Sequence, residues 1–157
     1  MVLLAACSPD EPPSPPVRLQ TTIAFPPKDT FQLGLPALTR WCSDRQSILI
    51  ESLSPEGSGV MMRLRYRDSL HSDSFPIVLP DDTGAVPAAT VALRFFVDDT
   101  PHGYTLDSGG VHVERTANAI VLSGTGVGVE KAMRMRAWFE SEPVPLGTDS
   151  VPCNYSP

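Results

Sequence analysis

Arginine side chains are the most promising chemical groups in this sequence. Two of the twelve basic residues are lysines and the other ten are arginines, whose planar guanidinium groups form paired contacts with anions and stack on aromatic rings. If the predicted strands that carry them are neighbours, they form one arginine–aromatic patch able to bind anionic sugars, lipid headgroups or a partner protein. The predicted patch comprises Arg63, Arg65, Arg67, Arg94, Arg134, Arg136 and Trp138. The alternative is a solvated sheet face on which Glu114, Glu130 and Glu140 pair with arginines across strands.

Carboxylates offer a second kind of chemistry. Glu51 and Glu114 each lie on a predicted strand, and glycoside hydrolysis requires two carboxylates that face each other across a cleft. No sequence feature pairs these two residues, so we expect both at the surface.

Calcium takes six to eight oxygen ligands, and two aspartate pairs at predicted strand ends are candidates for it. These are Asp81, Asp82, Asp98 and Asp99. Aspartate is also common in turns for backbone hydrogen-bonding reasons, and we predict neither a metal nor another cofactor.

Other motifs point away from familiar enzymes. The run SGTGVG at residues 123–128 lacks the lysine and the strand-to-helix context of a phosphate-binding loop, so it indicates a turn or bulge. No G-x-S-x-G sequence occurs. His71, His102 and His112 lack metal-ligand spacing and are expected at the surface. The net charge of −6 argues against nucleic-acid binding, which needs a basic surface.

The first residues, MVLLAAC, resemble a targeting signal. Residues 4–7 (LAAC) resemble the lipobox of bacterial lipoproteins, in which the cysteine becomes the lipid-modified N-terminus after cleavage. The resemblance implies that residues 1–6 are the remnant of a signal peptide and that residues 7–16 comprise lipidated Cys7 and a proline-rich tether. Only six residues, none of them basic, precede Cys7, whereas a complete signal has a basic region and about 7–15 apolar residues. The alternative is an apolar N-terminus ahead of a linker.

A lipid on Cys7 implies export and membrane anchoring. The resemblance places the protein in the bacterial cell envelope, with Ser8 compatible with the outer membrane and the domain in the periplasm or at the surface. The chain has three cysteines, so Cys42 and Cys153 remain as a pair, and an oxidising compartment favours a disulfide between them. Such a bridge closes a loop of about 110 residues, worth roughly 4–5 kcal/mol in the chain-entropy model. The alternative is two buried free thiols.

Residues 17–157 read as one all-β domain. Apolar and polar residues alternate with a period of two along most of the chain, and the seventeen prolines and eleven glycines suit short strands joined by turns. Strands are expected at residues 17–25, 30–35, 47–53, 59–67, 74–79, 88–97, 111–116, 119–123 and 129–140. The last of these also fits a helix with a narrow apolar stripe, although the flanking glycines and prolines favour a strand. We predict an antiparallel β-sandwich of about eight or nine strands, immunoglobulin-like or jelly-roll-like in general architecture.

Two functions fit these observations. The first is a cell-envelope lipoprotein with a non-enzymatic binding or structural domain, which presents a sheet face or loop tips to an envelope protein or glycan. The second is a hydrolase of envelope components or polysaccharides that uses a carboxylate pair. The sequence contains no recognisable nucleophile, metal or phosphate motif, and this favours the binding module.

Overall fold

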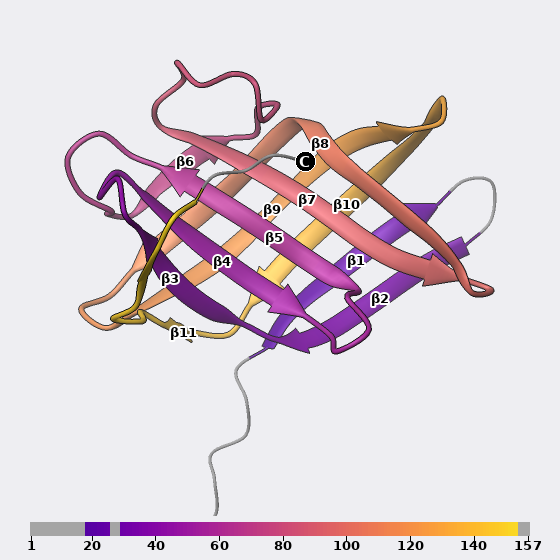
Figure 1. The fold of residues 1–157 in the computed structure, drawn as a ribbon, viewed down its shortest axis with the longest axis horizontal. Coiled ribbons are helices and arrows are strands. Elements are labelled where there is room, and N and C mark those ends of the chain that lie inside the picture. The colour runs from indigo at the N-terminus through magenta and orange to yellow at the C-terminus, as the bar shows by residue number, and fades with distance from the viewer. Residues whose placement is uncertain (1–17, 26–28, 154–157) are drawn as a thin grey trace, which may run out of the picture.

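The protein is all-β. We analysed a computed structural model that describes residues 18–25 and 29–153 (Figure 1). The signal remnant, the lipidated Cys7 and the tether predicted from the sequence therefore lie outside the described residues. Within the described ranges no helix is long and apolar enough to cross a membrane. The strands of the described chain are β1 (Arg18–Phe25), β2 (Asp29–Pro36), β3 (Leu38–Cys42), β4 (Ser47–Leu53), β5 (Gly59–Arg65), β6 (Asp73–Pro76), β7 (Ala88–Val97), β8 (Thr100–Arg115), β9 (Ala119–Glu130), β10 (Met133–Ser141), β11 (Val144–Pro145) and β12 (Ser150–Val151).

These strands form one strongly curled half-barrel sheet. Its order is β12-β3-β4-β5-β7-β8-β9-β10-β1-β2, with β6 paired to β8 and β11 to β9, and all pairs of strands except β12–β3 are antiparallel. The all-β, antiparallel prediction is confirmed. The predicted sandwich of two separate sheets does not form. The sixteen-residue β8 instead continues from one half of the curled sheet into the other and so joins the two halves. It pairs with β7 over residues 100–105 and with β9 over residues 106–115, with a bulge between Leu106 and Ser108.

Period-two alternation places the core on the inner face of the sheet. In β5, Val60, Met62 and Leu64 are buried whereas Arg63 and Arg65 alternate with them on the outer face. The predicted ambiguity over residues 129–140 resolves to strand. Lys131 and Ala132 both have positive φ and form the tight connection from β9 to β10, a backbone geometry that joins antiparallel strands rather than continuing a helix.

The two ends of the curled sheet approach each other, and the C-terminal segment joins them. Ser52 on β4 donates a hydrogen bond of 3.1 Å to the carbonyl of Leu35 on β2. The hydroxyl of Thr39 on β3 donates one of 2.9 Å to the carbonyl of Pro145 on β11. The indole nitrogen of Trp41 donates another of 2.7 Å to the carbonyl of Gly147. The segment after β10 therefore runs from β9 to β3, as Figure 1 shows for the yellow end of the ribbon.

Candidate functional site

An open groove of about 790 Å³ lies on the outer face of the half-barrel, where β6, β8, β9, β10 and β1 lie side by side. Strand register places five polar side chains of its lining in one row across these five strands. Ser74 pairs with His112, His112 with Ser123, Ser123 with Glu140, and Glu140 with Gln20. Within the row, the Ser74 hydroxyl lies 3.2 Å from Nδ1 of His112. The row combines hydroxyl, imidazole, carboxylate and amide groups, which together donate and accept hydrogen bonds.

A second row beside the first carries an exposed indole ring. Trp138 on β10 is 41% exposed and pairs with Thr22 on one side and Thr125 on the other. Thr125 in turn pairs with Gly110 on β8, and Gly110 pairs with Pro76 on β6, so the row lacks a side chain at its β8 position. The guanidinium carbon of Arg136 lies 6.0 Å from the centre of the Trp138 ring, within cation–π range. The groove thus has an aromatic wall next to a hydrogen-bonding row.

The glycine-rich run lies within β9, and its inward glycines make room for side chains of β8. A Cβ on Gly126 would approach the side chain of Leu106 to 2.5 Å, and one on Gly128 would approach the ring of Tyr104 to 2.6 Å. The run was expected to form a turn or bulge, but the bulge lies opposite it, on β8. The glycines therefore serve packing rather than phosphate binding. On the outer face, Gly110 of β8 leaves part of the groove without a side chain.

The predicted arginine patch is divided between two separate regions of the outer surface. Strands β5 and β7 are neighbours, but β10 is separated from β7 by β8 and β9. On β7, the guanidinium carbon of Arg94 lies 5.5 Å from the ring centre of Phe96. On β10, Arg134 and Arg136 share the outer face of the strand with Trp138. Of the predicted patch, only this β10 group lies beside the groove.

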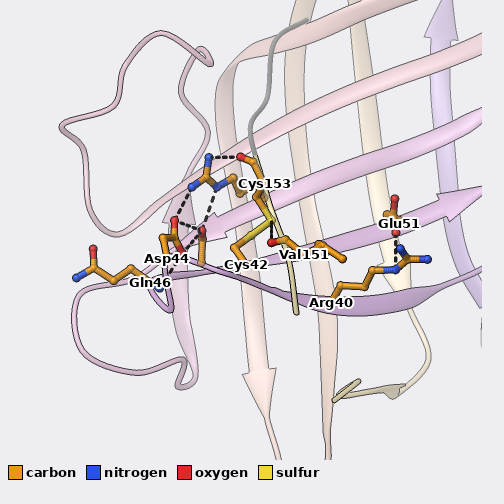
Figure 2. Close-up of a disulfide and its surroundings, with 9 residues drawn as sticks. Arg40, Cys42, Asp44, Gln46, Glu51, Val151 and Cys153 are labelled. Carbon is orange, nitrogen blue, oxygen red and sulfur yellow. Dashed lines mark hydrogen bonds and ion pairs between the residues drawn. A yellow bond between two sulfur atoms is a disulfide. The ribbon is translucent and has the colours of Figure 1, made fainter. Parts of the chain in front are cut away.

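Arg63 is part of a structural network around the disulfide (Figure 2). The predicted Cys42–Cys153 bridge is present, with the two Cα atoms 5.3 Å apart. Arg63 donates hydrogen bonds of 2.9 Å to the carbonyl of Cys153, 2.7 Å to Asp44 and 3.0 Å to the hydroxyl of Ser47. Partial burial acts to raise the pKa of Asp44, but hydrogen bonds from Gln46, Ser47 and Arg63 outweigh it and lower that pKa. This arginine holds the C-terminal segment on the sheet.

Arg65 at the end of β5 and Arg67 just after it lie away from the groove, as do the aspartate pairs. Arg65 donates a hydrogen bond of 2.5 Å to the carbonyl of Asp82, and Arg67 is exposed. The pair at residues 98–99 has positive φ at both positions and forms the tight turn between β7 and β8. The pair at residues 81–82 precedes β7, so the two pairs lie at opposite ends of that strand. No group of three or more potential metal ligands occurs in the part of the chain that the structure describes.

The two strand glutamates do not face each other. Glu51 on β4 forms an ion pair of 3.2 Å with Arg40 on the adjacent β3. Glu114 on β8 is exposed, with its carboxylate 4.0 Å from Nε2 of His112. Strands β4 and β8 are separated by β5 and β7. Among the groove-lining residues that the structure describes, Glu140 is the one carboxylate.

A polar cluster of His102, Glu130 and Tyr104 was not predicted from the sequence. His102 on β8 places Nδ1 2.8 Å from Glu130 at the end of β9, and the two side chains are only 13% and 11% exposed. The expected surface position of His102 is therefore wrong. The N–H of Gly103 donates a second hydrogen bond of 3.0 Å to Glu130. Burial acts to raise the pKa of Glu130, but the bonds from His102 and Gly103 lower it. Burial, followed by the charge of Glu130, raises the pKa of nearby Tyr104.

This cluster connects the β7–β8 turn to the β9–β10 turn and does not line the groove. His102 stacks on Phe95 at 5.4 Å between ring centres, and Tyr104 meets the same ring edge-on at 6.2 Å. Its position on the inner face, opposite the groove, indicates a structural role. His102 and Glu130 are 28 residues apart, and no local sequence signal could have paired them.

Comparisons with protein-family models, with curated proteins and with solved structures find no significant match for this chain.

Proposed function

We propose that this chain is a non-enzymatic binding module of the bacterial cell envelope and that its groove holds an oligosaccharide. One observation carries the proposal: the exposed ring of Trp138 stands beside a row of five hydrogen-bonding side chains. An indole ring offers a rigid apolar surface for the C–H face of a sugar, and the polar row offers donors and acceptors for its hydroxyls.

The row also indicates how the ligand lies. It crosses five strands, and four inter-strand spacings of about 4.8 Å give a length of about 19 Å. That length accommodates several linked sugar units lying across the strands. The groove is open, so internal segments of a longer chain can enter it from the side. We therefore expect affinity to rise with the number of sugar units until the row is filled.

An envelope location fits this function. The LAAC motif supports a lipid on Cys7, and residues 8–16 would then tether the domain to the membrane. The Cys42–Cys153 disulfide supports export, because disulfides persist in oxidising compartments. We propose the outer membrane of a Gram-negative cell as the site of anchoring, with the domain in the periplasm or at the cell surface.

Binding has more support than hydrolysis. A glycosidase needs two carboxylates on either side of the bond that it cleaves, and the described lining of the groove includes Glu140 as its single carboxylate. Glu51 and Glu114 lie on different strands away from each other. We therefore prefer a module that holds a glycan without cleaving it.

The experiment is to screen the purified domain against an array of neutral and acidic oligosaccharides of graded length, and then to titrate the best binder by calorimetry. Trp138→Ala should weaken binding by at least about tenfold, because it removes the stacking surface. Phe96→Ala is the matched control. Phe96 is also an exposed aromatic residue, 37% accessible and stacked on an arginine, but it lies on β7 outside the groove.

The proposal would be overturned by any of three results. The first is that no oligosaccharide on the array binds the folded domain. The second is that Trp138→Ala binds as tightly as the wild type, and the third is that Phe96→Ala loses as much affinity as Trp138→Ala, since in either case the groove would not be the binding site. Thermal unfolding of both variants establishes that any loss reflects binding rather than stability.

A further inference from the structure

Two arginines beside the groove have no negatively charged partner among the described residues. Arg134 and Arg136 are exposed on the outer face of β10, and neither forms an ion pair with any residue that the structure describes. The three glutamates expected to pair with arginines on this face form no ion pair with Arg134 or Arg136: Glu114 lies beside His112, Glu130 binds His102, and Glu140 has no ion pair with the described residues.

The cross-strand partners of these arginines in the described strands are uncharged. Across the strands, Arg136 pairs with Val127 and Ala24, and Arg134 pairs with Val129. Val129 is itself half exposed. Because successive outward residues of a strand lie about 6–7 Å apart, the two guanidinium groups offer two spaced anion contacts next to an apolar surface. Arginine favours carboxylates in such a place because its planar fork binds them with two hydrogen bonds.

The indole ring of Trp138 lies between this arginine pair and the rest of the groove lining on β10. Trp138 lines the groove, and the guanidinium carbon of Arg136 lies 6.0 Å from its ring centre. A sugar that meets the Trp138 ring therefore has a cation within reach at the next outward position of β10. The protein carries a net charge of −6, so long-range attraction does not recruit an anion, and local contacts must select it.

We propose that the groove selects an acidic oligosaccharide, and that Arg136, supported by Arg134, binds a carboxylate of the sugar unit next to the one stacked on Trp138. This inference rests on the proposed function and adds the class of glycan. Neutral sugars can still use the ring and the polar row, but they leave the arginine pair without a partner. Arg136 is thus a specificity-determining residue rather than part of the general sugar surface.

The test compares each acidic oligosaccharide on the array with its methyl-esterified form, which keeps the sugar and removes the charge; oligogalacturonate is one such pair. We expect the wild type to bind the acid about three- to tenfold more tightly than the ester, as for an exposed charge-assisted contact. Arg136→Gln should remove that preference, so that the acid and the ester bind with equal affinity. Arg94→Gln, which alters the arginine stacked on Phe96 outside the groove, should leave the preference intact.

Each result decides between the proposals. If acids and esters bind equally, if the best ligands are neutral, or if Arg136→Gln keeps the preference, the inference of an acidic glycan is overturned and the sugar-binding function stands. If no oligosaccharide on the array binds, neutral or acidic, the proposed function itself fails. Vesicles containing phosphatidylglycerol are tested in parallel, and vesicle binding that depends on Arg136 without any glycan binding would overturn both.

Discussion

Arg63 donates a hydrogen bond of 2.9 Å from Nη1 to the carbonyl oxygen of Cys153, ninety residues further along the chain. The same guanidinium group binds Asp44 at 2.7 Å and Ser47 at 3.0 Å. One side chain therefore connects β5, the β3–β4 turn and the disulfide-linked C-terminal segment. Arg63, which the sequence suggested as part of a binding face, therefore has a structural role.

Replacing Arg63 should destabilise the protein. Arg63→Met removes three hydrogen bonds and leaves the carboxylate of Asp44 without its cation, so we expect a loss of about 1–3 kcal/mol in the free energy of unfolding. Arg67→Met is the matched control, because Arg67 is exposed and forms no ion pair with the described residues. It should change stability by less than about 0.5 kcal/mol. Urea unfolding of both variants measures the difference, and equal losses would contradict the structural role of Arg63.

The strands could be predicted from the sequence because alternation is a local property. In β5 and β10 the period-two pattern assigns each side chain to the correct face, and it does so without knowledge of any neighbouring strand. The Cys42–Cys153 bridge followed from the count of cysteines once Cys7 was set aside. These inferences need only short stretches of chain or simple arithmetic.

The site could not be predicted because it depends on which strands are neighbours. The arginine patch required β5, β7 and β10 to adjoin, and two strands separate β10 from the others. The polar row of the groove exists only because four strand pairs have the register that aligns Gln20, Glu140, Ser123, His112 and Ser74. Two of these pairs, β8–β9 and β9–β10, are hairpins whose register the short turns set, but β6–β8 and β1–β10 join strands that are not consecutive in the sequence, and their register leaves little local trace.

The His102–Glu130 contact should make stability depend on pH. The pKa of Glu130 is lower in the folded protein than its ordinary value of 4.5, so its contribution is fully present above that value. It is lost as the pH falls through the lower, folded-state pKa. Glu130→Gln should therefore cost about 1–3 kcal/mol at pH 7 and progressively less below about pH 4. Urea unfolding of the wild type and the variant across this range measures the effect. A cost that stays constant with pH would contradict an ionised Glu130 in the folded state.

The close approach of β8 to β9 predicts that a single methyl group at residue 128 will be costly. A Cβ on Gly128 would lie 2.4 Å from the carbonyl oxygen of Thr105 and 2.6 Å from the Tyr104 ring. The backbone atom cannot move without shifting the β8–β9 ladder, so Gly128→Ala should lose about 1–3 kcal/mol through overpacking. Gly84→Ala is the control, since a Cβ there has no atom within 4 Å. Thermal and urea unfolding should separate the two variants clearly. If they are equally stable, Tyr104 does not need the space that Gly128 provides, and the glycine run would require another explanation.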